Sequence, residues 1–485
     1  MVFSSHLFIF YFLPVTILSS ILLPKRLKNL GLTVVSYIFY GWANPLFMGL
    51  MLFSTLVDYL SGIAIHGLFG VVQKSGLTPL PENTTRSTSQ KMFLILSLSS
   101  NLSLLAFFKY FNFFIDSYNG LVNILGFDNI ILDVSFRITL PLGISFYTFQ
   151  SMSYTIDLYR GKVKVMRSFI DFACFVSLFP QLVAGPILRF ADVVEQLKHR
   201  KQSIQMYVRG ASFLIIGLAK KILIANFCGK IADLAFETSP VFFADAWFGI
   251  AAYAFQIFFD FSGYSDMAIG LGLMLGFVFP KNFDSPYRSK SISEFWGRWH
   301  LSLSYWLRDY LYIPLGGNKK GPNRTYINIA TVMLLGGLWH GASWNFVAWG
   351  LIHAFLLIVE RMRGKRPIYH NLPEPLRMAI TFILILVTWV FFRADSLHDA
   401  IVYCGSLFGL TAYGSNALLI GTRLYNPLNI FIMAIAVLCT WFIPQTWRLT
   451  KKLTTLKILI IIVVFVLSII VMTHQSYNPF IYFIF

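Results

Sequence analysis

The chain has 485 residues, of which 56% are hydrophobic and only 12% are charged, and its mean hydropathy is +0.67. Because a soluble domain carries roughly 25% charged residues, this composition excludes a soluble globular protein. The net charge of +18 gathers in short connectors between apolar runs, as in the cytoplasmic loops of membrane proteins, so it does not indicate nucleic-acid binding.

Long apolar runs recur from one end of the chain to the other and predict membrane-embedded helices. A spanning helix needs about 20 mostly apolar residues, so we expect roughly eleven to thirteen helical segments, some too short or too polar to span. The runs lack the period of two that a β-barrel requires, and the expected fold class is therefore all-α. In chain order the runs are 7–23, 30–40, 46–60, 93–107, 169–183, 244–259, 327–338, 346–359, 378–392, 430–443 and 458–472.

The order of charges around the first run predicts its topology. No basic residue precedes this run, whereas Lys25, Arg26 and Lys28 follow it. We therefore expect a retained first span with its N-terminus outside, rather than a cleaved signal.

No shift in composition is long enough to mark a second folded domain, which predicts one membrane-embedded domain over residues 1–485. Polar, Gly and Pro residues interrupt the apolar pattern mainly in the middle third, about 136–360. Interrupted helices at membrane depth occur where they line a cavity or are buried in protein. We expect the chemistry in this middle third, with no metal site, because the four cysteines are scattered and form no ligand pattern.

Two carboxylates, Asp260 and Asp266, lie in an apolar stretch. Their spacing of six residues puts them on opposed faces of a regular helix, about 240° apart, which argues against shared acid–base work. Buried charges are generally paired, so we expect structural hydrogen bonds at a helix break here.

Aromatic and polar residues alternate over 291–311. Ser291 and Glu294 have the spacing of a capping box, which predicts that one helix begins there and runs through the segment. An aromatic stripe on that helix is explained by a membrane interface without any ligand, but Arg298, His300, Arg308 and Asp309 indicate a polar opening. The stripe consists of Trp296, Trp299, Leu303, Trp306 and Tyr310.

His340 is the most informative residue, because it stands in the apolar segment 336–345 (GGLWHGASWN). Ionisable groups at bilayer depth are costly and usually functional, and imidazole moves a proton readily near neutral pH. The alternative is a neutral histidine that is hydrogen-bonded inside a helix bundle. His353 follows thirteen residues later, about 220° around a continuous helix, so we expect it to be structural.

Several segments together resemble the membrane-bound O-acyltransferase family, and its bacterial alginate O-acetyltransferase-like branch in particular. The resemblance runs from the first residues to the last. Its motifs are 140–150 (LPLGISFYTFQ), 179–186 (FPQLVAGP), 260–268 (DFSGYSDMA), 294–318, 336–345, 391–394 (FFRA) and 480–483 (FIYF).

The resemblance implies a helical bundle with a central tunnel between the cytoplasmic and outer faces. The family's near-universal histidine corresponds to His340 and its second histidine to His300, and both are predicted to be catalytic. His340 is expected to deprotonate an acceptor hydroxyl or to relay the acyl group covalently, with His300 orienting the donor or assisting proton transfer. Substrate contacts are expected from Trp299, Arg308, Asp309, Trp339 and Asn345.

The implied reaction moves an acetyl group from a cytoplasmic thioester such as acetyl-CoA toward an extracytoplasmic, alginate-like polysaccharide. No bound cofactor is expected. Lys319, Lys320 and Arg324 could attract the anionic donor. The expected location is the bacterial inner membrane, among membrane lipids and beside a periplasmic acetyltransferase partner that completes the transfer.

Three alternatives remain from the sequence. The acceptor could be peptidoglycan or another envelope glycan, with D-alanine transfer to teichoic acid as a more distant relative of this chemistry. From other classes, a transporter or flippase would also have many helices with interrupted spans and buried carboxylates. A structural scaffold of an export complex would tolerate loss of both His300 and His340.

Overall fold

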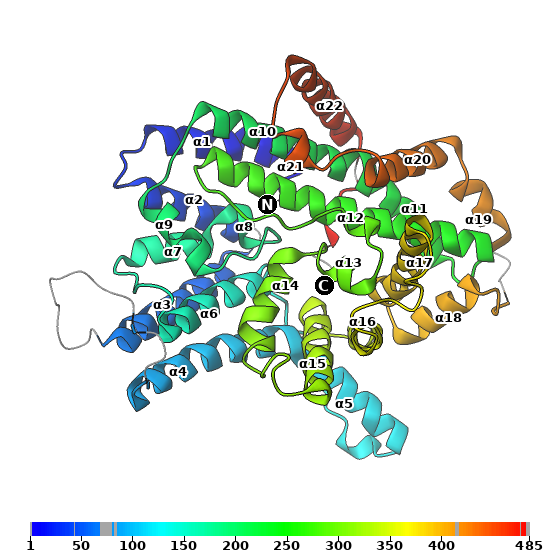
Figure 1. Cartoon of the computed structure of the whole chain (residues 1–485), viewed down its shortest axis with the longest axis horizontal. Coiled ribbons are helices and arrows are strands. Elements are labelled where there is room, and N and C mark those ends of the chain that lie inside the picture. Colours follow the sequence, from blue (N-terminus) through cyan, green and yellow to red (C-terminus); the bar gives the residue numbers. More distant parts are fainter. Residues whose placement is uncertain are drawn as a thin grey trace. The chain divides into compact units, whose positions relative to one another are not determined.

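The computed structural model describes residues 2–42, 44–67, 80–81, 85–412, 417–475 and 477–481. These residues form helices and connecting turns without any strand, which confirms the all-α fold class (Figure 1). The chain divides into two compact units, one of residues 1–203 with 274–279 and the other of 204–273 with 280–485.

Unit 1 contains the first nine helices. Aromatic residues from distant parts of the sequence form a core there, with Phe39 and Phe179 ring centroids 5.3 Å apart. A second, polar core joins α3, α4 and α6, where the buried Asp58 accepts hydrogen bonds from Ser97 and Asn101. The helices are α1 (Leu13–Leu22), α2 (Lys28–Gly41), α3 (Leu46–His66), α4 (Thr88–Leu105), α5 (Phe111–Leu125), α6 (Ile144–Arg160), α7 (Phe169–Ser177), α8 (Phe179–Leu182) and α9 (Phe190–Lys198).

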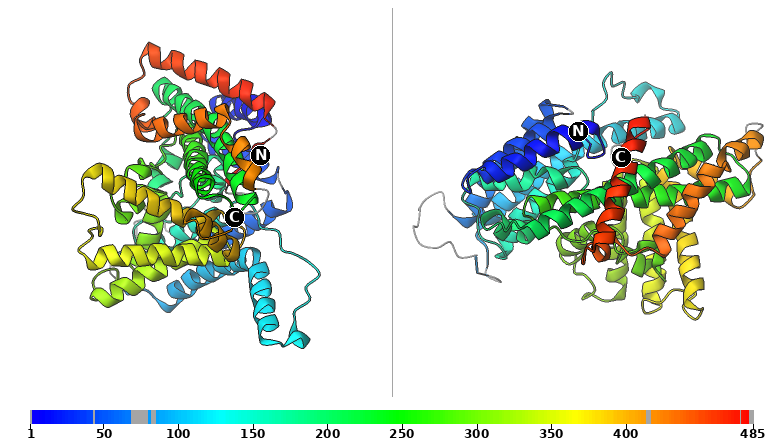
Figure 2. Two further views of the ribbon diagram at one scale, coloured as in Figure 1. Left: turned by 90° about the vertical axis from the view of Figure 1, so that its right-hand side faces the viewer. Right: turned by 90° about the horizontal axis from the view of Figure 1, so that it is seen from above.

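Unit 2 contains the other helices and all the residues predicted to be catalytic. Its α15 and α16 form an antiparallel hairpin, visible as two adjacent helices in Figure 2. The helices are α10 (Ile204–Ala219), α11 (Asn226–Glu237), α12 (Phe243–Met274), α13 (Ile292–Trp296), α14 (Leu301–Leu307), α15 (Pro322–His340), α16 (Trp344–Met362), α17 (Glu374–Arg393), α18 (Leu397–Leu407), α19 (Ala417–Leu424), α20 (Pro427–Trp441), α21 (Thr446–Leu449) and α22 (Thr455–His474).

Short π-helical turns interrupt several of these helices. One of them, η4 (Lys220–Ala225), joins α10 to α11 and carries two consecutive lysines into the interior of unit 2. Another, η6 (Arg308–Tyr312), extends α14. Single π-turns inside α-helices frequently occur at functional sites, since they re-aim side chains.

Six helical segments of the described residues are long and apolar enough to cross a membrane, and the chain is a multi-pass membrane protein. They are 46–66, 88–125, 204–237, 344–362, 374–393 and 455–474. The eleven apolar runs expected from the sequence coincide with helical structure, although the run 169–183 is divided at Leu178 between α7 and α8. The segment 204–237 was missed, because Lys220, Lys221 and Lys230 interrupt its apolar pattern.

Candidate active site

His300 is placed by a break in the polypeptide. The predicted continuous helix over 291–311 was wrong, because α13 ends at Trp296 and α14 begins at Leu301. His300 lies between them with φ 44° and ψ 54°, in the left-handed region that costs free energy for a residue other than glycine. Such strained residues cluster at functional sites, where the surrounding structure holds them.

Asn282 holds the chain that follows this strained residue. Its backbone oxygen accepts a hydrogen bond from the Leu301 amide at 2.9 Å, and its side-chain oxygen accepts one from the Ser302 hydroxyl at 2.9 Å. Asn282 and Ser302 are both buried. These bonds fix the first turn of α14 and with it the direction of the His300 side chain.

The predicted N-terminal cap of this segment is correct. The Ser291 hydroxyl accepts a hydrogen bond from the Glu294 amide at 3.0 Å. The buried Glu360 carboxylate of α16 accepts two further bonds, from the amides of Ile292 and Ser293 at 2.7 and 2.9 Å. A carboxylate at a helix N-terminus is stabilised by the free amides and the helix dipole, so Glu360 ties α13 to α16.

His340 is the last residue of α15, and small residues let the chain turn back directly after it. A Cβ atom at Gly350 would lie 2.6 Å from the backbone oxygen of Met333, and Cβ atoms at Gly337 and Gly341 would collide with Phe346. The glycines therefore permit close packing of α15 on α16, which holds the C-terminal end of α15 firmly in place.

The two histidines are neighbours. Their ring centroids lie 6.3 Å apart, His300 is fully buried and His340 is 5% exposed. Burial lowers the pKa of the His300 imidazole, which lies outside the candidate spans, to about 3. His300 is therefore neutral at physiological pH, and the pair can handle a proton without bringing two positive charges together.

Aromatic rings surround the pair. Trp339 contacts both histidines, with centroids 5.9 Å from His300 and 5.1 Å from His340. Phe261 meets the His300 ring edge-on at 4.7 Å, and Phe392 meets His340 at 5.2 Å. These rings exclude water, and electrostatic interactions inside such a site are stronger than in bulk solvent.

The other residues predicted to contact substrate lie in different environments, some buried and some near the surface. Trp299 is buried among aromatic rings and packs on Trp389 at 5.0 Å. Asn345 is buried and donates a hydrogen bond to the backbone oxygen of Ala394 at 2.6 Å, which ties the start of α16 to the end of α17. Arg308 and Asp309 form an ion pair with each other at 2.7 Å in η6, and the Arg308 side chain is 54% exposed.

The sequence analysis missed Trp349, which lies against both His340 and His353, the histidine predicted to be structural. The Trp349 ring lies 5.3 Å from His340 and 4.8 Å from His353, and the Trp296 indole donates a hydrogen bond to His353 Nδ1 at 3.3 Å. The argument from a continuous helix does not apply, because α15 ends at His340 and α16 runs back alongside it. The short segment of small residues 341–343 (GAS) directly after His340 was the signal for this reversal.

The two carboxylates form structural contacts, as expected, but the expected helix break is absent because α12 runs without interruption from Phe243 to Met274. Asp260 forms an ion pair with Lys221 at 2.8 Å and accepts a hydrogen bond from the Ile481 amide at 3.0 Å. Asp266 pairs with Lys220 at 2.6 Å and accepts from the Thr446 hydroxyl at 2.6 Å. Within the described part of the chain, no cluster of three or more His, Cys, Asp or Glu residues is arranged to hold a metal ion.

The candidate site is a buried pair of imidazoles at helix ends inside a multi-pass helical membrane protein. Sequence comparison identifies the family of such proteins. The model of the membrane-bound O-acyltransferase family matches residues 161–392, which include both histidines. The chain belongs to the membrane-bound O-acyltransferase family, and the enzyme is an O-acyltransferase.

Several relatives cover most of the chain. It is 41% identical to the probable alginate O-acetylase AlgI of Pseudomonas putida over the whole of both chains. It is 46% identical to the probable alginate O-acetylase AlgI of Azotobacter vinelandii, over 82% of this chain and 76% of the relative. It is 36% identical to the peptidoglycan O-acetyltransferase of Helicobacter pylori, over 84% of this chain and 80% of the relative.

Proposed function

We propose that the enzyme moves an acetyl group from a cytoplasmic thioester, acetyl-CoA, across the bacterial inner membrane for O-acetylation of an extracytoplasmic, alginate-like polysaccharide. The observation that carries the chemistry is the buried pair of His300 and His340, 6.3 Å apart at two helix ends. The names of the relatives support acetyl as the group and alginate as the acceptor. The transporter alternative is not retained, because the chain belongs to a family of acyltransferases.

His340 is the general base in this proposal. Its ring nitrogen takes the proton of an acceptor hydroxyl while the hydroxyl oxygen attacks the thioester carbonyl. The C–O bond forms, the C–S bond breaks, and the departing thiolate takes the proton back from His340. General base catalysis of this kind contributes typically about 10²–10⁴-fold to the rate.

A covalent relay is the second form of the same chemistry. The His340 nitrogen would attack the thioester carbonyl and release the thiolate, and the acyl-imidazole would then pass its acetyl group to the hydroxyl. In either form, His300 orients the donor or assists the proton transfer from its strained position beside His340. Trp339 would contact the acyl group, since its ring lies against both imidazoles.

The other residues that were predicted to contact substrate have more limited roles in this proposal. Asn345 positions the site by holding α16 to Ala394, and Trp299 closes it on the side of Trp389. Arg308 and Asp309, paired near the surface of η6, would guide a polar substrate toward the site.

An exposed basic cluster supports an anionic donor. Lys319, Lys320 and Arg324 are exposed at the start of α15, and His340 is the last residue of the same helix. At 1.5 Å per residue, a helix of 19 residues is about 28 Å long. Acetyl-CoA carries phosphates at one end and its thioester at the end of a long flexible arm. This shape suits the separation between the basic cluster and His340.

The rest of the assembly is proposed from the family. We place the whole of residues 1–485 in one catalytic domain with a central tunnel, because the identity to the Pseudomonas putida protein extends over both complete chains. A periplasmic acetyltransferase would accept the acetyl group on the outer side and finish the transfer. Membrane lipids surround the enzyme, and no nucleic acid takes part.

Peptidoglycan is the second candidate acceptor, favoured by the 36% identity to the Helicobacter pylori peptidoglycan O-acetyltransferase. The histidine pair would perform the same chemistry on either glycan. The two acceptors differ only in where a labelled acetyl group arrives.

The test is acyl transfer by the purified enzyme in proteoliposomes. Acetyl-CoA labelled in the acetyl group is supplied on one side, and periplasmic extract with either alginate or peptidoglycan on the other. We expect thioester consumption and labelled alginate. Labelled peptidoglycan would establish the second acceptor, and intact passage of a substrate without thioester consumption would contradict acyl transfer.

A further inference from the structure

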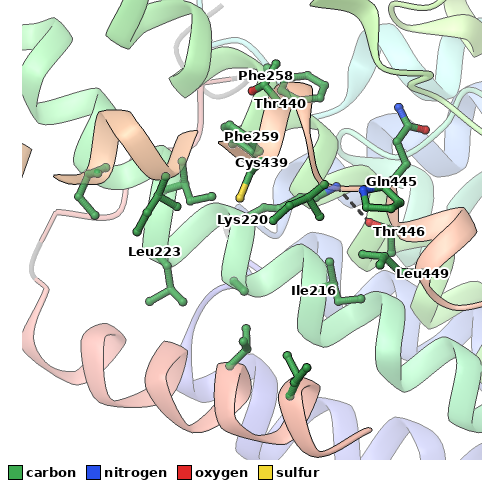
Figure 3. Close-up of a pocket in the computed structure, with 18 of the residues that line it drawn as sticks. Ile216, Lys220, Leu223, Phe258, Phe259, Cys439, Thr440, Gln445, Thr446 and Leu449 are labelled. Atoms are coloured by element: carbon green, nitrogen blue, oxygen red, sulfur yellow. Dashed lines mark hydrogen bonds between the residues drawn. The ribbon is translucent and has the colours of Figure 1, made fainter. Parts of the chain in front are cut away.

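Unit 2 contains an apolar cavity of about 620 Å³ away from the histidine pair (Figure 3). Its walls come from α10 and η4 on one side and from α20 and α22 on the other, with residues such as Leu223, Ile435 and Ile461. Neither His300 nor His340 lines it. The volume falls within the range of about 300–1,000 Å³ typical of small-molecule sites.

One end of this cavity is polar. Lys220, Thr446 and Gln445 lie there, and Figure 3 shows the Lys220 side chain reaching toward Thr446. The Lys220 ammonium donates to Asp266 at 2.6 Å and to Thr446 at 3.1 Å, so its charge is already balanced. The polar end therefore needs other cations if it is to hold an anion.

Such cations lie directly beyond this end. Arg448, Lys451 and Lys452 are exposed after Thr446, and Lys457 at the start of α22 lines the cavity. From residue 400 to 485 the sequence contains no Asp or Glu. Across the described ranges no carboxylate forms an ion pair with any of these four residues, which makes this end of the cavity strongly cationic.

Aromatic rings form one wall of the cavity. Phe258 and Tyr287 line it with centroids 5.3 Å apart, and Tyr287 packs on Trp299 at 6.1 Å. The Tyr287 hydroxyl donates to the backbone oxygen of Ala254 at 2.8 Å, which fixes this wall. A ligand in the cavity is thereby kept apart from the reacting groups.

We propose that this cavity binds an acyl chain of an anionic glycerophospholipid, with the lipid phosphate on the cluster of Arg448, Lys451, Lys452 and Lys457. The bilayer supplies this ligand, because α22 is the most apolar candidate span and only 11% of its apolar window is buried in the protein. Each basic residue beside a membrane helix contributes favourably to the free energy of binding anionic lipid headgroups. The cationic end suits an anionic headgroup and the apolar lining suits an acyl chain. An anionic phospholipid combines the two.

The experiment measures lipid retention by native mass spectrometry of the full-length protein purified in detergent. The probes are phosphatidylglycerol and phosphatidylcholine with identical acyl chains. We expect one phosphatidylglycerol retained at about tenfold or greater preference over phosphatidylcholine. Equal retention of the two lipids, or retention of neither, would overturn the proposal.

Two matched pairs of variants locate the site. Ile461→Trp fills the cavity and is expected to abolish retention, whereas Ile462→Trp, on the adjacent exposed residue that does not line the cavity, leaves retention unchanged. If Ile461→Trp does not fold, Leu223→Trp fills the cavity from the opposite wall. Equal retention by a folded filling variant and by Ile462→Trp contradicts the site.

In the second pair of variants, each protein lacks three exposed cations, either beside the cavity or at a control position. Substituting Arg448, Lys451 and Lys452 by Gln is expected to lower the preference for phosphatidylglycerol about tenfold or more. The same change at Arg363, Lys365 and Arg366, which are exposed after α16, is expected to leave it unchanged. A similar loss in both variants would show a general effect of net charge, and this would overturn the proposed headgroup site.

Discussion

Unit 2 buries two groups of ionisable side chains in opposite ways. The pairs Lys221–Asp260 and Lys220–Asp266 neutralise each other at 2.8 and 2.6 Å. The histidines lie among aromatic faces instead, with His300 fully buried 4.7 Å from Phe261 and 6.3 Å from His340. Each charged side chain of the ion pairs is thus held by an opposite charge, whereas the two imidazole rings face one another among aromatic rings.

The comparison shows that burial of a polar residue does not by itself mark the active site. Asp260 is buried more deeply than His340, yet its partners leave it a structural role. The useful criterion is whether an ionisable group is held by an opposite charge or lies beside a second ionisable group of the same kind. Each of the first three predictions below changes one member of this comparison, and the fourth changes an exposed ion pair outside it.

The largest expected effect is the loss of acyl transfer on His340→Ala. Removal of the proposed base lowers the rate of thioester turnover by about 10²–10⁴-fold. The control is His398→Ala, an exposed histidine at the start of α18, which should retain full activity. Full turnover by a folded His340→Ala protein would remove His340 from the chemistry.

The next effect concerns the ion pair, where Lys221→Met leaves the Asp260 carboxylate buried without its cation. Breaking one partner of a buried pair costs about 3–5 kcal/mol. We expect a large fall in the thermal unfolding midpoint in detergent. Adding Asp260→Asn, which removes the orphaned charge and keeps an oxygen for the Ile481 amide, should recover much of this stability. A double variant no more stable than Lys221→Met would contradict the explanation by charge.

A smaller effect follows from the low pKa of His300. Its folded pKa of about 3 lies below the ordinary value of 6.5, so below pH 6.5 the unfolded chain binds a proton that the folded chain does not. Stability therefore falls as the pH is lowered, by about 2 kcal/mol between pH 7 and pH 5. Unfolding of wild type and His300→Asn across this range measures the difference, since Asn tolerates the left-handed backbone but does not titrate. Parallel curves for the two proteins would show that His300 is not buried as a neutral group.

The smallest effect is expected for the exposed pair in η6. Arg308 is 54% exposed, and exposed ion pairs contribute roughly 0–1 kcal/mol. Arg308→Gln should hardly change the unfolding midpoint, while a rise in KM for the donor or acceptor would reveal its proposed role in substrate guidance. Strong destabilisation would place Arg308 with the structural pairs instead.

Much of the fold could be predicted from the sequence because apolar runs dominate it. Every apolar run of the sequence coincides with helical structure. Ser291 caps the N-terminus of α13, as predicted. The span 204–237 was missed because Lys220 and Lys221 look unfavourable in a membrane until their partners are known. Those partners, Asp266 and Asp260, lie on a different helix, and sequence periodicity carries no information on such pairing.

The sequence did not predict the geometry of the candidate site, and the catalytic role of its residues stays a prediction. His300 and His340 could be selected from the family motifs, yet the breaks that bring them together were not foreseen. Periodicity assumes a continuous helix, and it failed between Trp296 and Leu301 and again after His340. For the same reason, it separated His353 from His340, although the Trp349 ring lies against both imidazoles.

The most direct test of the central claim compares two folded proteins in one acyl-transfer assay. One is His340→Ala, and the other carries Lys221→Met with Asp260→Asn, which removes a buried ion pair without leaving a charge. Thioester turnover in proteoliposomes should fall by about 10²–10⁴-fold in the first and persist in the second. Persistence in His340→Ala together with loss in the charge-free variant would contradict the account and move the chemistry to the carboxylates of α12.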